Sequence, residues 1–248
     1  MNKIVSVKKI YTSGYSKTIR LKNNLRVIEV LSLLNCFIPK NPERMLDVGC
    51  GDGYLSAEFS KILGAKQVFG IDISPVAVKD ALGHGIKAIA LDTDEEDLPY
   101  EDAYFDFIFC GGLIELVFDP DRLLKELHRL LKENGYLILT FPNLGAWASR
   151  IAVLFGYLPY YSIVSRIYDV GKFRIPANKY KNISKGFVRL YTLHSFCQLV
   201  GKYGFKIIKA KGAGENTAPL FMRCIDVILS KIPSLAFQVI CILKKDAQ

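Results

Sequence analysis

The chain has 248 residues and a net charge of +9, and half of its residues are hydrophobic. This composition excludes a wholly disordered chain and predicts one α/β domain with additions. No apolar run reaches the roughly 18 residues of a membrane-spanning helix, and no signal-peptide core follows the basic start. The six cysteines are scattered without a C-x-x-C pair, so we expect no disulfide framework, no metal site and a reducing, cytoplasmic location.

The charge is spread unevenly along the chain. Residues 1–40 carry a net charge of +7, residues 41–140 carry −10 and residues 141–248 carry +12. The basic flanks are either solvated surface or faces for an anionic partner, such as phosphate, nucleic acid or the surface of an anionic membrane. The acidic middle would repel polyanions. Peripheral membrane contact is therefore one alternative to a fully cytoplasmic protein.

The first part of the chain predicts a helix followed by an alternation of strands and helices. Residues 1–40 form a basic extension with a helix at Asn24–Phe37, and residues 41–248 form the main domain. Short apolar runs alternate with helical spacing, which predicts a parallel sheet built from βαβ units. Asp119 should cap the third helix of this region, and Gly135 should end it. We expect strands at Met45–Val48, Gln67–Ile73, Lys87–Leu91, Phe105–Cys110 and Tyr136–Phe141, and helices at Tyr54–Leu63, Pro75–Leu82 and Pro120–Lys132.

The alternation stops after Phe141. Residues 143–190 are aromatic and basic, and we expect them to form a lid or an acceptor-binding insertion. Within them, Trp147–Tyr161 predicts a helix packed on the sheet, a cover over a hydrophobic ligand or a membrane-facing surface. The remaining elements should complete the same sheet, with helices near Thr192–Tyr203 and Pro219–Lys231 and strands at Phe205–Lys211 and Ala236–Leu243.

A glycine-rich turn joins the first strand to the following helix. It reads Asp47-Val48-Gly49-Cys50-Gly51-Asp52-Gly53 and predicts a ligand site at the carboxyl end of the strand. Its G-x-G-x-G spacing differs from the G-x-G-x-x-G of NAD-binding proteins, and Asp47 would repel a pyrophosphate. A carboxylate there suits the cationic amino group and sulfonium of S-adenosylmethionine (SAM), held directly or through water.

Two further acidic residues end the next two strands. Asp72 follows the glycines by about twenty residues, where a carboxylate can accept hydrogen bonds from both ribose hydroxyls. Asp92 and Thr93 end the third strand and are placed to meet an adenine edge. Together with Asp47, these residues favour SAM over NAD as the cofactor.

These motifs resemble the class I SAM-dependent methyltransferases, in the group of ubiquinone-biosynthesis-like and methionine-biosynthesis-like enzymes. The resemblance covers about residues 44–143 and includes Gly70-Ile71-Asp72-Ile73-Ser74 and the helix that begins at Pro120. It implies an α/β, Rossmann-like sheet of seven strands, mostly parallel with an antiparallel last strand, and helices on both faces. It also implies the cofactor-binding residues Asp47, Gly49, Cys50, Gly51, Gly53, Asp72, Ile73, Asp92, Thr93, Cys110 and Gly111.

Two residues are candidates for catalysis. Because SAM carries an activated methyl group, the protein mainly has to position the acceptor. Glu115 lies just past the fourth strand as an acceptor contact or base, and His194 lies near the start of a late helix. Many relatives have Glu-His where this chain has Glu115-Leu116, and a histidine where it has Phe187.

The leading hypothesis is an enzyme that transfers a methyl group from SAM to a small-molecule acceptor, apolar or lipid-linked, by in-line displacement. The basic flanks raise RNA or DNA methylation as an alternative. The run Gly111–Ile114 is unlike the Asn-Pro-Pro-aromatic motif of nucleic-acid N-methylating enzymes, so nucleic acid is disfavoured. The absence of the two histidines raises another alternative, a non-catalytic SAM-binding regulatory or partner protein.

Overall fold

The computed structural model describes residues 24–165, 168, 170–172, 187–215 and 220–246, and for residues 220–222 it describes only the backbone. The helices are α2 (Leu25–Cys36), α3 (Tyr54–Leu63), α4 (Pro75–Gly83), α5 (Pro120–Leu130), α6 (Trp147–Leu154), α7 (Leu193–Lys202) and α8 (Leu220–Leu229). The strands are β1 (Arg44–Val48), β2 (Gln67–Asp72), β3 (Lys87–Ala90), β4 (Phe105–Gly111), β5 (Leu131–Pro142), β6 (Phe205–Ala213) and β7 (Gln238–Lys245).

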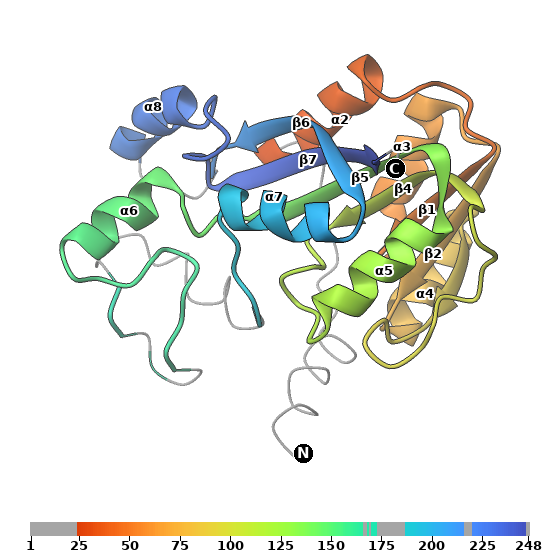
Figure 1. Ribbon diagram of the computed structural model, residues 1–248, viewed down its shortest axis with the longest axis horizontal. Helices are drawn as coiled ribbons and strands as arrows, with labels where there is room; N and C mark the ends of the chain where they lie inside the picture. Colours follow the sequence, from red (N-terminus) through yellow and green to blue (C-terminus); the bar gives the residue numbers. More distant parts are fainter. Residues whose placement is uncertain (1–23, 166–167, 169, 173–186, 216–219, 247–248) are drawn as a thin grey trace.

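The seven strands form one sheet in the order β3-β2-β1-β4-β5-β7-β6. All neighbours are parallel except β7, which runs antiparallel to both β5 and β6. The chain builds outward from β1 through β2 to β3 and then returns to place β4 on the other side of β1 (Figure 1). This order confirms the predicted Rossmann-like fold and reverses direction at β1 and β4, and such sheets bind ligands in the crevice at the carboxyl ends of the strands at this point.

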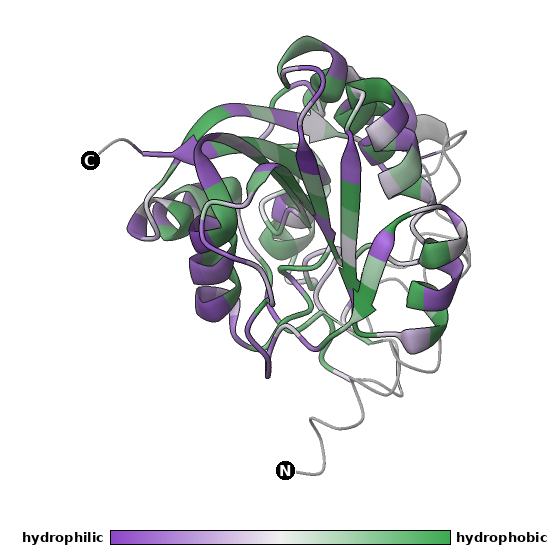
Figure 2. Ribbon diagram, turned by 90° about the vertical axis from the view of Figure 1, so that its right-hand side faces the viewer, coloured by the Kyte–Doolittle hydropathy of each residue, from purple (hydrophilic) through white to green (hydrophobic). Residues whose placement is uncertain are grey.

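Helices cover both faces of the sheet. One core lies under α5 and α7 and includes Leu127, Phe141 and Phe196, all fully buried. The other lies under α2, α3 and α4 and includes Leu34 and Phe59. Figure 2 shows the apolar strands between these helical layers. Because both faces of the central strands are buried, their sequences are nearly continuous apolar runs.

Side-chain caps fix where the helices begin. Ser74 accepts a hydrogen bond from the amide of Ala77, and Asp119 accepts one from Arg122, which confirms the predicted cap at Asp119. The prediction that Gly135 ends the helix was wrong. The helix α5 ends at Leu130, and β5 already begins at Leu131, which pairs with Phe105 across a register shift.

The helices α6 and α8 lie side by side beyond one end of the sheet (Figure 1). Nε1 of Trp147 on α6 donates to Oδ1 of Asp226 on α8 at 3.1 Å, and Trp147 packs edge-on against Phe237. The outer sides of both helices expose apolar side chains, with Leu154 79% exposed and Ile228 65% exposed. No helix in the described part of the chain is long and apolar enough to cross a bilayer.

Candidate active site

The glycine turn forms a tight loop at the carboxyl end of β1, which we call the glycine loop (residues 49–53). Gly49, Gly51 and Gly53 all have positive φ angles, of 83°, 55° and 74°. The amides of Gly49 and Cys50 donate to the carbonyl of Ile71 at 2.7 and 3.0 Å, which ties the loop to β2. The loop therefore turns tightly against the end of β2, in a conformation that favours glycine.

Asp47 is a buried carboxylic acid just before this loop. It is only 2% exposed, and its Oδ2 accepts a hydrogen bond from the hydroxyl of Ser56 on α3. Its Oδ1 is buried without a partner. Burial raises the pKa of Asp47 to about 7, against the hydrogen bond from Ser56, and the neighbouring Asp72 raises it further. A cationic group beside Oδ1 would both pair with this carboxylate and restore its ionised form.

Asp72 ends β2 and faces the glycine loop. Its Oδ2 accepts from the amide of Gly51 at 2.8 Å, and its Oδ1 accepts from the amide of Ser74 at 2.9 Å. Burial raises the pKa of Asp72, while these backbone hydrogen bonds lower it. Each carboxylate oxygen keeps further acceptor capacity, so Asp72 is held rigidly and can still accept from two hydroxyl groups.

Cys50, Cys110 and Gly111 lie at or just after the carboxyl ends of β1 and β4. Both thiols are buried, and burial raises the pKa of each. A Cβ atom at Gly70 would lie 2.7 Å from Sγ of Cys50, so this thiol fills space against β2. The cysteines therefore act as small packing residues here, and neither has the lowered pKa of a nucleophilic thiol.

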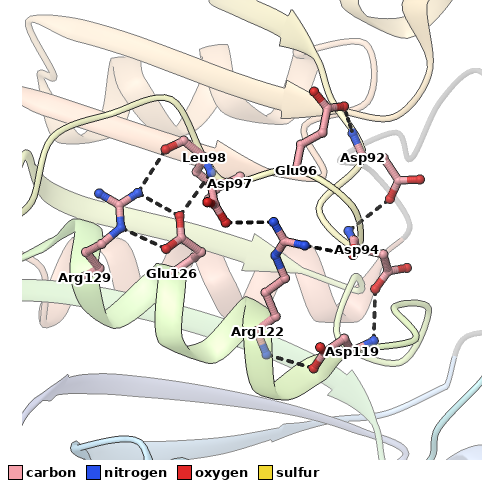
Figure 3. Close-up of polar contacts among 9 residues, drawn as sticks. All are labelled: Asp92, Asp94, Glu96, Asp97, Leu98, Asp119, Arg122, Glu126 and Arg129. Atoms are coloured by element: carbon pink, nitrogen blue, oxygen red, sulfur yellow. Dashed lines mark hydrogen bonds and ion pairs between the residues drawn. The ribbon is translucent and has the colours of Figure 1, made fainter.

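The predicted adenine-contact residues, Asp92 and Thr93, lie in the loop that follows β3. Figure 3 shows Asp92 in this loop. Oδ1 of Asp92 accepts from the amide of Asp94 at 3.0 Å. The carboxylate of Asp94 in turn accepts from the amides of Phe118 and Asp119, at 2.9 and 3.0 Å. These bonds join the loop to the segment just before α5.

Two arginines of α5 brace the same loop (Figure 3). Arg122 pairs with Asp97 at 2.7 Å, and Arg129 pairs with Glu126 at 2.7 Å while donating to the carbonyl of Leu98 at 2.9 Å. The loop that carries Asp92 is therefore fixed by charge-assisted hydrogen bonds to a helix on the sheet.

Glu115 lies beyond β4, close to the crevice. It is only 3% exposed, and its Oε2 is buried without a partner. Burial raises the pKa of Glu115 to about 7, partly offset by its backbone hydrogen bond and by the charge of Arg26. Its carbonyl accepts from the amides of Val188 and Arg189 at 2.8 and 3.1 Å, which anchors the end of the insertion.

The structure does not bring His194 to this group. His194 is exposed on the first turn of α7, and no described contact joins it to the glycine loop or to Glu115. The predicted cofactor residues, by contrast, gather at the carboxyl ends of β1, β2, β3 and β4.

A family model described as a methyltransferase domain matches residues 22–210. The chain belongs to this methyltransferase-domain family. Among solved structures, a SAM-dependent methyltransferase from Mesorhizobium loti is similar over 88% of this chain and 96% of its own, with a TM-score of 0.59 and 18% identity. The family and the fold imply SAM as the cofactor, in agreement with the resemblance found in the sequence.

The methyltransferase domain also has curated relatives. A ubiquinone biosynthesis O-methyltransferase of Xanthomonas oryzae is 40% identical over 116 residues, which are 45% of this chain and 48% of the relative. The mitochondrial arginine-hydroxylase NDUFAF5 of Homo sapiens is 34% identical over 101 residues, which are 41% of this chain and 29% of the relative. The chain thus spans about half the length, or less, of these relatives.

Three residues of this methyltransferase domain escaped the sequence analysis. Ser56 orients Asp47, Arg26 acts on Glu115 through its charge, and Gln238 donates to the hydroxyl of Tyr161. The sequence could have indicated Arg26, because this charged residue stands on the apolar stripe of α2, one turn before the buried Val30. No sequence pattern indicates Ser56 or Gln238, since their partners are distant in the sequence.

Proposed function

We propose that the chain transfers the methyl group of SAM to a small-molecule acceptor. The observation that carries this proposal is the buried, unpartnered Oδ1 of Asp47 beside a glycine loop at the topological switch of the sheet. An unpaired buried oxygen costs about 1–3 kcal/mol, and a cationic ligand would remove that cost. The methionine end of SAM carries such a cation.

The residues around the crevice fit this cofactor. Asp47 would hold the amino group, directly or through one water, and the glycine loop would let the ligand approach the backbone closely. Asp72 would accept hydrogen bonds from the ribose hydroxyls, with Ile73 beside the ring. Asp92 and Thr93 would meet the adenine. On the other side, Cys110 and Gly111 would line the sulfur end.

Methyl transfer from SAM depends more on the positioning of the acceptor than on a strong general base. Bound SAM supplies a methyl group already activated by the sulfonium. The chain's own residues would hold the acceptor in line with the carbon–sulfur bond and exclude water from the crevice. Glu115 is the predicted acceptor contact, because its carboxylate is buried beside the end of β4. His194 would serve only if α7 contributes to the acceptor's entrance.

Nucleic acid is a poorer acceptor than a small molecule. The loop that is predicted to meet adenine carries acidic residues at positions 92 and 94–97. A polyanion approaching this rim of the crevice would be repelled, in spite of the basic flanks.

An apolar or lipid-linked acceptor is supported by the exposed surface of α6 and α8. Leu154, Phe155, Val227 and Ile228 are all more than 60% exposed. Exposed apolar groups beside a basic segment are typical of peripheral binding to an anionic membrane. Flotation with anionic and neutral vesicles at low salt tests this part. We expect binding to the anionic vesicles, and equal failure to float with both would remove the membrane from the proposal.

The transferase activity is tested with tritium-labelled SAM and a panel of small acceptors, alongside calorimetry of SAM and of S-adenosylhomocysteine. We expect both ligands to bind and the label to move to a small molecule. Failure of both to bind would refute the proposal. Binding without transfer across the panel would favour the non-catalytic alternative.

A further inference from the structure

Ser56 is a buried polar side chain to which the proposed function gives no role. It lies in the first turn of α3, three residues after the cap residue Gly53, and it is fully buried. Its hydroxyl donates to Oδ2 of Asp47 at 2.5 Å, a length found for hydroxyl groups that donate to an ionised carboxylate. The contact therefore joins the end of β1 to the start of α3 across the glycine loop.

This contact is unusual for a serine inside a helix. Such a hydroxyl commonly faces solvent or bonds to the backbone of its own helix. Ser56 is closed to solvent, and its hydroxyl bonds to a side chain of another element. Ser149 on α6 is a buried helix serine of a different kind, because its oxygen accepts from the backbone amide of Tyr160 at 3.2 Å. The hydroxyl of Ser56 is thus directed at one carboxylate.

The other groups around Asp47 oppose its ionised form. Burial raises the pKa of Asp47 to about 7, and the carboxylate of Asp72 on β2 raises it as well. Burial also raises the pKa of the neighbouring thiols of Cys50 and Cys110, so both stay neutral. Of the described groups that act on Asp47, Ser56 is the one that lowers its pKa. The hydroxyl of Ser56 therefore favours a charge that its surroundings disfavour.

The hydrogen bond also determines which oxygen of Asp47 stays free. Because Ser56 holds Oδ2, Oδ1 is left buried without a partner. Most buried polar atoms in proteins are paired, so this oxygen points to a donor that a ligand supplies. A hydroxyl group can both donate and accept, so Ser56 can hold Oδ2 whether Asp47 is ionised or protonated. Asp47 can thus change its charge without turning its side chain.

We propose that Ser56 is a positioning residue for the cofactor: it holds Oδ2 of Asp47 so that Oδ1 faces the cationic amino group of SAM, and it lets Asp47 ionise at a lower pH than burial alone would allow. The inference rests on the proposed function and deepens it, because it names the residue that sets the pH range of cofactor binding. The proton that Asp47 loses when it pairs with the cation passes to the solvent. Without the hydroxyl of Ser56, this loss would be less favourable.

Calorimetry of S-adenosylhomocysteine with wild-type protein and Ser56→Ala, between about pH 6 and about pH 8.5, tests the proposal. A hydrogen bond to a charged group is strong enough that its loss should reduce the ionised fraction of Asp47 about tenfold wherever the carboxyl is mostly protonated. We therefore expect Ser56→Ala to bind about tenfold more weakly than wild type near pH 6 and almost as tightly near pH 8.5. A serine that only fills space would instead weaken binding by one factor at every pH.

Two further variants support this comparison. Ser149→Ala is the matched control, because Ser149 is also a buried helix serine and has no described contact with Asp47. It should keep the wild-type pH profile. Ser56→Cys keeps most of the volume and replaces the hydroxyl with a weak donor. It should show the same pH-dependent deficit as Ser56→Ala, and it tests the proposal even if the alanine variant does not fold.

A deficit that is equal near pH 6 and near pH 8.5, or no deficit at all, would overturn the inference. Carbon-13 NMR of the Asp47 carboxyl in the ligand-free proteins separates it from the proposed function. We expect this carboxyl to titrate at a higher pH in Ser56→Ala than in wild type. If it does so and S-adenosylhomocysteine binds neither protein, the proposed function fails and the effect of Ser56 on Asp47 stands. If the ligand binds and the carboxyl titrates alike in both proteins, only this inference fails.

Discussion

The glycine loop and the surroundings of Glu115 differ in how the chain assembles them. The loop comes from consecutive residues, and the pairing of β1 with β2 brings Asp72 to it directly. The surroundings of Glu115 depend on contacts between segments far apart in the sequence, such as Glu115 with Val188 and Arg26 with Thr140. The proposed cofactor site is therefore encoded locally, whereas the proposed acceptor site depends on how the outer segments pack. The same kind of cofactor site can in this way be combined with different acceptor sites.

The largest expected effect is at Asp72. Replacing Asp72 with Ala removes the predicted acceptor of two ribose hydrogen bonds and the anchor for the amide of Gly51. Hydrogen bonds to a charged group contribute about 1.5–3 kcal/mol each, so S-adenosylhomocysteine should bind at least about a hundredfold more weakly by calorimetry. Glu133→Gln is the control, because the Glu133 side chain is 76% exposed near the start of β5. If Asp72→Ala bound as tightly as the control, the ribose assignment would be wrong.

The burial of Glu115 makes a prediction about stability and pH. The pKa of Glu115 rises from 4.5 to about 7 on folding, so between these values the folded protein keeps a proton that the unfolded chain has lost. Wild-type stability should therefore fall as the pH rises through this range. Glu115→Gln avoids the buried charge, and its advantage should grow by up to about 3 kcal/mol by neutral pH.

Urea unfolding of both proteins from acidic to neutral pH measures this advantage. Glu133→Gln should show no such gain, because Lys245 lowers the pKa of the exposed Glu133. An advantage of Glu115→Gln that stays constant with pH would show that Glu115 does not titrate as a buried acid.

A smaller effect on stability separates backbone strain from overpacking at Gly53 in the glycine loop. Gly53 and Gly85 both have positive φ angles, but only at Gly53 would a Cβ meet a neighbour, at 2.9 Å from Cα of Ala81. Gly85→Ala should cost about 1 kcal/mol from backbone strain alone. Gly53→Ala should cost at least about 1 kcal/mol more because the core would be overpacked. Equal losses in urea unfolding would mean that the loop does not depend on its close approach to α4.

The smallest effect is the pH dependence of cofactor binding. The pKa of Asp47 is about 7, and a cation beside it would lower that pKa, so binding should release up to one proton. Below neutral pH, the affinity for SAM should fall by up to about tenfold for each pH unit. Calorimetry in buffers of different ionisation enthalpy counts the protons. Asp47→Asn should abolish the release, and a release that persists in this variant would implicate another group.

Much of the fold follows from the sequence, because the strands are buried on both faces and bounded by glycine or aspartate. The predicted and observed bounds of α3 agree at Tyr54–Leu63. The prediction failed at residues 131–135, where Lys132, Glu133 and Asn134 are polar although they extend β5. Their place in the sheet depends on pairing with Phe105 across a register shift, which no local pattern reports.

The glycine loop and the surroundings of Glu115 also differ in how far the sequence predicts them. The motif around Asp47 and the spacing to Asp72 predicted that these residues would meet at one edge of the sheet, since parallel strands bring their carboxyl ends together. Glu115 was predicted from its place after the fourth strand. The nearby Arg26 was not, because it reaches Glu115 only through the packing of α2. Much of the aromatic and basic insertion, including Arg166 and Arg174, lies outside the described residues.

The most direct test is a crystal structure with S-adenosylhomocysteine bound. Our account predicts the amino group at Oδ1 of Asp47, directly or through one water, and the ribose hydroxyls on Asp72. It predicts the sulfur beside Cys110 and Gly111, on the side of Glu115. A ligand bound away from the ends of β1 and β4, or with its sulfur turned away from Glu115, would contradict it.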